Sequence, residues 1–417
     1  QSLRRNLPLV PVHDLTIKDG DLIAATHGRG FWILDDLSAV RQMQPQILRA
    51  PAYLFKPRNA YRAGFGGGGG NGAAGGHPSG ANPPAGGVIY YWLAQPKQVV
   101  TLDFLDPAGK VIRSFTSQQD SLVATDSVRA DSVRRARNDS LRRAGVAPDT
   151  TLRSEERGEE TASDEPPSRR PPPPRVANKA GLNMFAWNLR YPDASSFENM
   201  IFWAGGIAGP VVLPGNYTVR MKVNGQTYTQ PLTVVRDPRV TATDADLREQ
   251  FDLLMRIHDK TSQANDAVKL IRNVKAQLAD RTKRMPTSGS AAFSRSATAL
   301  ADRLSAIESE IYQVKNQSSQ DPLNYPIRLN NKIAALAGVV GGTESKPTSQ
   351  SYTVFNDLSV QLDRQLSAIT GALVVLPSLN STLKAAGLAP IVPSTTEVKP
   401  APGTGASAES GGDEVER

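Results

Sequence analysis

The chain has 417 residues, with 48 Lys and Arg against 40 Asp and Glu, so its formal net charge is +8 at pH 7. It contains no cysteine, which excludes disulfides, thiolate metal sites and cysteine nucleophiles. A chain of this length exceeds what one hydrophobic core normally supports, so we expect several domains. Basic and acidic residues are mixed along the sequence, and this pattern does not favour a nucleic-acid partner.

The first predicted elements are three short strands within residues 12–36, with the sequences VHDLTIK, DLIAATH and FWILDD. Asp19-Gly20 and the Gly28-Arg29-Gly30 corner separate them, and glycine accepts the positive φ that tight turns require. The spacing predicts an antiparallel meander. Three strands cannot bury both faces of their sheet alone. The chain also begins at Gln1 in the middle of the strand pattern, so we expect further strands upstream.

The stretch LPLVPVHDLTIKDGDLIAATHGRGFWILDD resembles the closing blade of bacterial BNR-repeat, sortilin-like β-propeller proteins, which are often labelled glycosyl hydrolases. The resemblance continues in GLNMFAWNLRYPDA, PGNYTVRMKVNGQTYTQPLTVVRDPRVTATDADL and DPLNYPIRLNNKIAALAGVV. The Asp-box of such propellers, Ser-x-Asp-x-Gly-x-Thr-Trp, does not occur in the chain. The resemblance implies that residues 1–45 are the final blade of a truncated propeller and that the protein is secreted or periplasmic.

Residues 46–86 are predicted to be a linker that ends in a Gly-rich loop, GFGGGGGNGAAGGHPSGANPPAGG. The loop lacks the Gly-Lys-Ser/Thr ending of a phosphate-binding loop, and no strand leads directly from it into a helix. We therefore interpret it as a connecting segment.

Residues 87–240 alternate apolar and polar positions in GVIYYWLA, VVTLDFLDPAGKVIRSF, GLNMFAWNLRYP and GNYTVRMKVNGQTYTQPLTVV. Hairpin turns at DPAG and VNGQ favour an antiparallel, Ig/fibronectin-III-like β-sandwich. The segment VTLDFLDPAGKVIRSF also resembles the Ig-like domain of flagellar hook-capping proteins, which implies a connector or adhesion module. Residues 118–178 interrupt the pattern with repeated Asp-Ser-Val/Leu-Arg units and EPPSRRPPPPR, and we expect a disordered insert there.

Residues 241–392 change to a helical period and predict an antiparallel helical bundle. Thr243 is the expected N-cap of a helix of about forty residues, a length typical of long bundle helices. Further stripes lie at 300–314, 327–340 and 355–373, with Leu304 in the core and Glu308 on the solvent face. Residues 393–417 are predicted to be a disordered tail. Taken together, these elements predict a multidomain α+β fold.

The chain offers few candidate binding residues. His13, Asp14 and His27 could meet on neighbouring strands, but two imidazoles are a small ligand set, so we predict no metal site and no cofactor. His27 and Arg29 are candidate ligand-binding residues of a propeller mouth, although the glycines around Arg29 equally suit a plain turn. Trp203 lies in a Gly-bounded loop and is a candidate platform for a ligand.

Trp187 alternates with its strand, so we expect it to fill the core of the sandwich. We predict no catalytic residues: Asp35 and Asp36 are adjacent, and side chains of adjacent strand residues point to opposite faces. His258 belongs to a helical stripe and is expected to be a bundle residue.

These patterns favour a non-catalytic accessory region of a secreted or periplasmic propeller protein. It would pack on its own upstream propeller domain or bind a protein or glycan partner. Two alternatives stay open: a glycoside hydrolase whose active site lies on upstream blades, and a sortilin-like peptide-binding protein. No apolar run approaches the roughly 20 residues of a bilayer span, so no membrane span is predicted.

Overall fold

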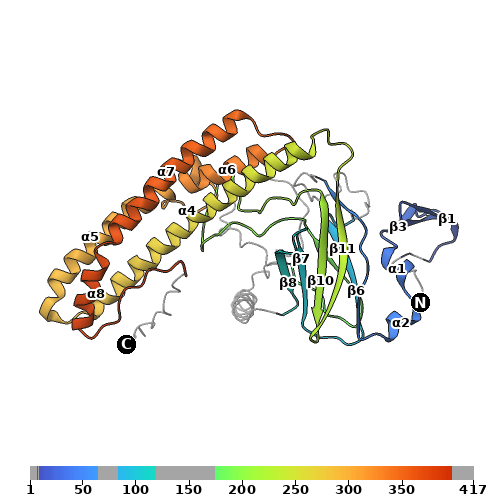
Figure 1. The fold of residues 1–417 in the computed structure, drawn as a ribbon, viewed down its shortest axis with the longest axis horizontal. Helices are drawn as coiled ribbons and strands as arrows, with labels where there is room; N and C mark the ends of the chain where they lie inside the picture. Colours follow the sequence, from blue (N-terminus) through green and yellow to red (C-terminus); the bar gives the residue numbers. More distant parts are fainter. Residues whose placement is uncertain (1–6, 8, 64–82, 119–173, 397–417) are drawn as a thin grey trace, which may run out of the picture. The chain divides into compact units, whose positions relative to one another are not determined.

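The computed structural model describes residues 7, 9–63, 83–118 and 174–396, and the chain is a mixed α+β protein with several sheets (Figure 1). Most of the Gly-rich loop, nearly all of the predicted disordered insert and most of the predicted tail lie outside the described residues. The chain divides into two compact units. The first unit comprises Gln1–Asp193, Ala208–Met255 and Val340–Thr348, and the second comprises Ala194–Ile207, Arg256–Val339 and Ser349–Arg417.

The first sheet is the predicted three-stranded meander. It contains β1 (Val12–Lys18), β2 (Asp21–Thr26) and β3 (Phe31–Leu34), which are all antiparallel and follow chain order. Two short helices, α1 (Ser38–Gln42) and α2 (Pro45–Arg49), follow it. The turn glycines have positive φ as expected, so this part of the sequence pattern is confirmed.

Two further sheets enclose one core in the first unit. The five-stranded sheet has the order β5 (Ala60–Arg62), β11 (Gln226–Arg236), β10 (Gly215–Val223), β7 (Val100–Leu105) and β8 (Val111–Thr116). The three-stranded sheet has the order β4 (Ala52–Leu54), β6 (Gly87–Leu93) and β9 (Gly181–Trp187). Neighbouring strands are antiparallel except β5 and β11, which are parallel.

The strands β4 and β5 correct one boundary, because residues 52–62 lie in the range predicted to be a linker. Each strand has only three residues, which is too short for a periodic pattern, and only pairing with β6 and β11 defines them. The core itself is aromatic: Trp187 stacks on Phe104 with 4.3 Å between ring centroids, and both side chains are fully buried. The expectation that Trp187 fills the core is confirmed.

The helices are α4 (Asp244–Arg284), α5 (Thr287–Ile311), α6 (Leu329–Gly341), α7 (Ser349–Leu373) and α8 (Leu376–Ala385), with a 3₁₀ turn at Asp321–Leu323. The predicted N-cap is confirmed: Asp246 N donates to Thr243 Oγ1 at 3.1 Å, and Thr243 N donates to Asp246 Oδ2 at 3.0 Å. Helix α8 was not predicted. Helix α5 ends at Ile311, so Val314, which the stripe included, lies beyond it and is exposed.

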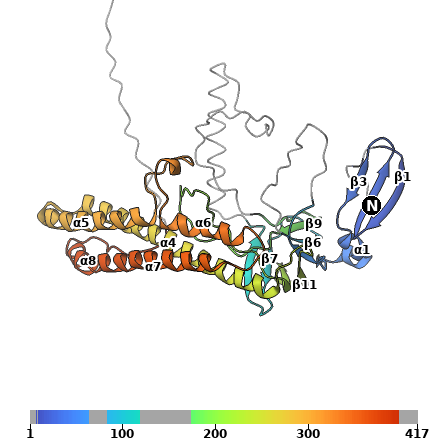
Figure 2. The ribbon, with the colours of Figure 1, turned by 90° about the horizontal axis from the view of Figure 1, so that it is seen from above.

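In the second unit, α4, α5 and α7 run alongside one another (Figures 1 and 2). Ion pairs join α4 to α7 and α4 to α5. Leu304 is fully buried as predicted, but the expectation for Glu308 is wrong, because Glu308 is also buried. Its two carboxylate oxygens accept hydrogen bonds from Arg272 Nε at 2.7 Å and Lys275 Nζ at 3.0 Å. Two cations on a neighbouring helix offset the desolvation of this carboxylate, and a stripe of apolar residues cannot reveal such partners.

One helical segment among the described residues, Ser349–Ala385, is long and apolar enough to cross a membrane by length and composition. Its best window has a mean hydropathy of 1.5, and 28% of that window is buried. Leu362 and Ile369 of α7 belong to this segment and pack inside the helical unit. The apolar residues by which this segment packs inside the helical unit account for part of its hydropathy. The expected absence of a membrane span stays a prediction.

Substitution of Glu308 tests the buried ion pairs. Glu308→Gln should lower the free energy of unfolding by about 1 to 3 kcal/mol, because Arg272 and Lys275 lose their carboxylate while a buried polar group remains. Glu310→Gln, two residues along the same helix and more than half exposed, should change it by less than about 0.5 kcal/mol. Denaturant unfolding measures both, and equal effects would contradict the burial of Glu308.

Candidate functional site

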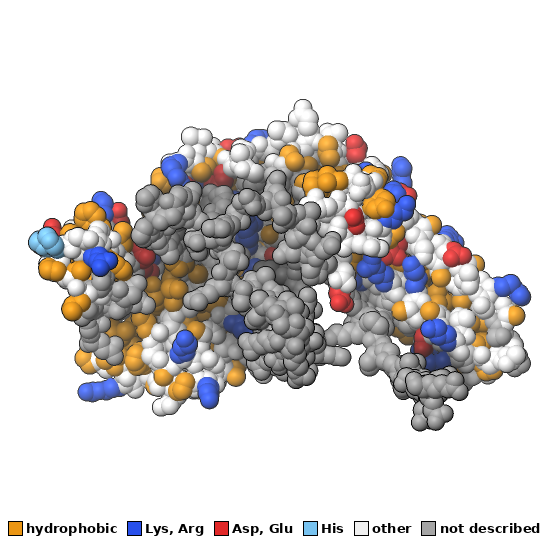
Figure 3. Space-filling view, turned by 180° about the vertical axis from the view of Figure 1, so that it is seen from behind, with side chains coloured by type: hydrophobic (Ala, Val, Ile, Leu, Met, Phe, Trp, Pro, Cys, Tyr) orange, Lys and Arg blue, Asp and Glu red, His pale blue; other side chains and the backbone are white. Residues whose placement is uncertain are grey.

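The candidate residues His27 and Arg29 lie at one end of the β1–β3 sheet. The His27 ring stacks on His13 with 5.2 Å between centroids, and both side chains are exposed. Histidine side chains are visible at the left of Figure 3. The described residues contain no group of three or more His, Asp or Glu side chains placed to hold a metal ion.

Arg29 occupies the tip of a tight turn. Gly28 and Gly30 on either side have φ of +73° and +69°, and Thr26 N and Oγ1 both donate to Gly30 O. The Arg29 carbonyl accepts from Trp32 Nε1 at 3.1 Å, whereas its guanidinium has no ion-pair or hydrogen-bond partner among the described residues. The glycines therefore serve the turn, and Arg29 is free to meet a partner.

Both faces of the β1–β3 sheet present large apolar side chains. The register places Leu15 and Ile17 on one face, where they are 59% and 54% exposed. Phe31 and Ile33 lie on the other face and are 78% and 58% exposed. Apolar side chains reach the surface of this sheet in Figure 3. A strand that is apolar on both faces is typical of a sheet that is covered on both sides.

This two-sided surface was not among the residues predicted as sites. The signal was present in the sequence, because LIAAT and FWIL are continuous apolar runs without the alternation of a half-buried strand.

The adjacent carboxylates Asp35 and Asp36 serve the structure after β3. Asp36 has a positive φ of 54°, its Oδ1 accepts from Ser38 N at 3.0 Å, and its own N donates to Asp21 Oδ1 at 2.8 Å. Burial, followed by repulsion from Asp21, raises the pKa of Asp35 above its ordinary value. Arg58 Nη1 donates to Asp21 at 2.9 Å and balances part of this negative charge.

Trp203, the third candidate residue, lies in a loop of the second unit that Asn331 of α6 holds in place. Trp203 N donates to Asn331 Oδ1, and Asn331 Nδ2 donates to Trp203 O, both at 2.8 Å. The Trp203 side chain nevertheless is 40% exposed. Sequence patterns could not place Asn331 here, since 128 residues separate the two partners.

A polar cluster fixes the start of the same loop. Ser195 Oγ donates to Asp266 Oδ1 at 2.5 Å and accepts from Lys269 Nζ at 2.6 Å. Lys269 also pairs with Asp266 at 2.7 Å, so its ammonium is engaged by a carboxylate and does not act as a base for the hydroxyl. Asn265 Nδ2 and Ser262 Oγ bond the Ser195 carbonyl and amide. Every polar atom of Ser195 is therefore hydrogen-bonded, and the residue attaches the loop to α4.

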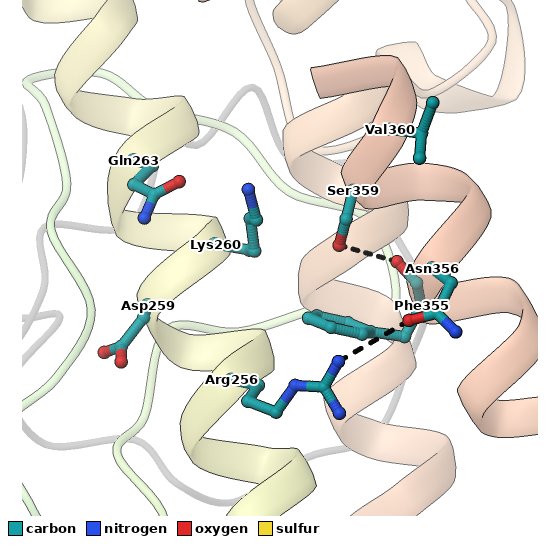
Figure 4. Close-up of a pocket in the computed structure, with 8 residues that line it drawn as sticks. All are labelled: Arg256, Asp259, Lys260, Gln263, Phe355, Asn356, Ser359 and Val360. Carbon is teal, nitrogen blue, oxygen red and sulfur yellow. Dashed lines mark hydrogen bonds between the residues drawn. The ribbon is translucent and has the colours of Figure 1, made fainter. Parts of the chain in front are cut away.

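A cavity of about 440 Å³ lies between α4 and α7 (Figure 4). The guanidinium of Arg256 lies 4.6 Å from the centroid of the buried Phe355 ring, and Lys260 pairs with Asp363 at 2.6 Å. Asp259 is the one carboxylate of the lining, and Figure 4 shows it pointing away from α7. This arrangement lacks the two facing carboxylates that glycoside hydrolysis requires. His258, next to Asp259, is a half-buried bundle residue, as predicted.

The most connected buried carboxylate is Asp103 on β7. It lies opposite Ser114 of β8 and Arg220 of β10, so both partners share its face of the sheet. Ser114 Oγ donates to it at 2.6 Å, Arg220 Nη2 at 2.8 Å, and Lys222 Nζ pairs with it at 3.1 Å. Burial alone raises the pKa of Asp103, but these hydrogen bonds outweigh burial and hold it below its ordinary value. It is an ion-pair centre that joins three strands.

Comparison of the chain with family models, curated proteins and solved structures finds no match.

Titration tests the Asp103 network. Because the pKa of Asp103 is lower in the folded chain, its ionised form stabilises the fold above its ordinary pKa of 3.8. That contribution disappears as the pH falls through the depressed folded-state pKa. Asp103→Asn should lower the free energy of unfolding near neutral pH by about 1 to 3 kcal/mol and flatten its decrease below about pH 4. Asp357→Asn, at an exposed position of α7, is the control; a parallel pH profile for both variants would contradict this role.

Proposed function

We propose that this chain is a non-catalytic interaction region whose β1–β3 sheet packs between neighbouring sheets of a β-propeller in a secreted or periplasmic protein. The observation that carries the proposal is the exposure of Leu15 and Ile17 on one face and of Phe31 and Ile33 on the other. A sheet of three strands gains little stability alone, and covering both faces removes this apolar surface from water. The resemblance of residues 7–36 to a propeller blade supports the same packing.

We further propose that the two-sheet domain is Ig-like and serves as a connector. The order β4-β6-β9 opposite β5-β11-β10-β7-β8 supports this, since an Ig-type sandwich divides its strands between two sheets in the same way. Tyr217, at the start of β10, donates its hydroxyl to Leu213 O at 2.7 Å. This bond from a tyrosine to the backbone just upstream resembles the tyrosine corner of Ig-like domains and supports the proposal.

Hydrogen exchange tests the packing of the blade. In residues 1–417 alone, the amides of β1–β3 should exchange fast, and Phe31→Ser should change the free energy of unfolding by less than about 1 kcal/mol. In the full-length product of the gene, the same amides should be protected and the same variant should cost about 2 to 5 kcal/mol, because Phe31 is then buried.

Val354→Ser provides the matched control, since Val354 is an exposed apolar residue of α7 and should behave alike in both proteins. Equal protection of β1–β3 in the two proteins, or a gene product without propeller strands before Gln1, would contradict the proposal.

Activity assays test the proposal that this chain is not catalytic. Purified residues 1–417 should not hydrolyse aryl glycosides, because a glycosidase needs two carboxyl groups held at a set separation across the scissile bond. Turnover by this chain that disappears in Arg29→Ala or Asp35→Ala would place an active site at the β1–β3 sheet and contradict the expectation.

A further inference from the structure

The loop around Trp203 combines a fixed backbone with an exposed aromatic side chain. Asn331 pairs with both polar backbone groups of Trp203, in the manner of a neighbouring strand. Phe197, earlier in the same loop, packs edge-on against Tyr312 with 4.9 Å between ring centroids, and the Tyr312 hydroxyl accepts from Ile201 N at 3.3 Å. The loop is therefore attached to α5, α6 and their flanks on both sides of Trp203.

The backbone just after Trp203 adopts a costly conformation. Ala204 has φ of +49°, a region that residues other than glycine occupy rarely. Gly205 has no room for a side chain, since an added Cβ would lie 3.0 Å from Ala335 N and 3.1 Å from Asn331 Nδ2. Tight packing thus holds the loop in a strained form while Trp203 stays outside. Strain of this kind is typical of functional positions.

The backbone that adjoins Trp203 is exposed. Ala204 and Gly206 are exposed, and a Cβ at Gly206 would meet nothing within 4 Å, so the adjoining backbone is open to solvent. A hot-spot residue of a protein interface is packed in an apolar pocket, whereas the backbone that follows Trp203 presents open polar groups.

We propose that Trp203 is a binding platform for a gluco-configured pyranose ring of a glycan. Such a ring carries its hydroxyls equatorially, so its axial C–H bonds form a flat apolar face that can lie on the electron-rich face of an indole. The neighbouring hydroxyls would then meet the open backbone groups of Ala204 to Gly206. Asn331 is a positioning residue, because it holds the Trp203 backbone and does not touch the sugar. This inference names a ligand for the interaction role proposed above, on a surface that does not include the β1–β3 sheet.

The experiment titrates residues 1–417 with cellohexaose and with chitohexaose and follows the indole N–H signals by NMR. Trp203→Phe identifies the Trp203 signal. We expect this signal to shift with at least one hexasaccharide and not with sorbitol, an acyclic polyol without a ring face. Trp203→Ala should weaken binding about tenfold or more, as loss of the stacking surface requires, and Trp203→Phe should weaken it less. Asn331→Ala should weaken binding while the helical content is retained.

Two controls separate this proposal from the packing of the blade. Trp32→Phe removes an indole of the β1–β3 sheet and should leave sugar binding unchanged, and so should Phe31→Ser. Absence of a shift with both hexasaccharides, or binding that persists in Trp203→Ala, would overturn the glycan platform. A protein partner captured through Trp203, with no response to either sugar, would overturn it as well and assign the loop to a protein. None of these outcomes depends on what covers Phe31.

Discussion

The stacking of Trp187 on Phe104 joins the three-stranded and five-stranded sheets that enclose the core of the first unit. Trp187 ends β9 of the three-stranded sheet, whereas Phe104 belongs to β7 in the centre of the five-stranded sheet. Phe115 and Phe185 extend the contact, with 4.7 Å between their ring centroids. Large aromatic rings bury much apolar area for little side-chain entropy.

A few buried carboxylates form ion pairs that join neighbouring strands or helices. Asp103 lies between strands, and Glu308 lies between helices, and each is surrounded by two cations. A third pair, Arg62 with Glu344, fixes the segment between α6 and α7 to the first unit, and Arg62 Nε also donates to Val212 O at 3.0 Å. Burying a single charge is costly, and a carboxylate with two donors recovers most of that cost.

Two surface features distinguish the described residues. Exposed apolar residues on both faces of β1–β3 and the exposed Trp203 are groups that bind by area and shape. Several of the titratable groups described above are engaged with each other: Lys269 with Asp266, Lys260 with Asp363, and Asp21 with Arg58. A general acid or base needs a proton position open to a substrate, and ion-paired side chains at closed contacts do not provide it.

Local patterns determined what depends on neighbours in the sequence. The strands of β1–β3, the hairpins of the sandwich and the long α4 with its Thr243 cap follow from period and turn chemistry. Tertiary structure decided the short strands β4 and β5, which exist only through pairing with β6 and β11, and helix α8, whose ten residues are too few for a clear stripe.

The same division holds for the candidate sites. The sequence alone identified Trp203 as a residue in a Gly-bounded loop, because glycine spacing is local. Only the folded structure shows that Asn331 binds the Trp203 backbone. The same is true of the burial of Glu308 between Arg272 and Lys275. Hydrogen bonds and ion pairs between distant residues depend on distances of a few ångströms, and a one-dimensional pattern of apolar and polar residues does not contain those distances.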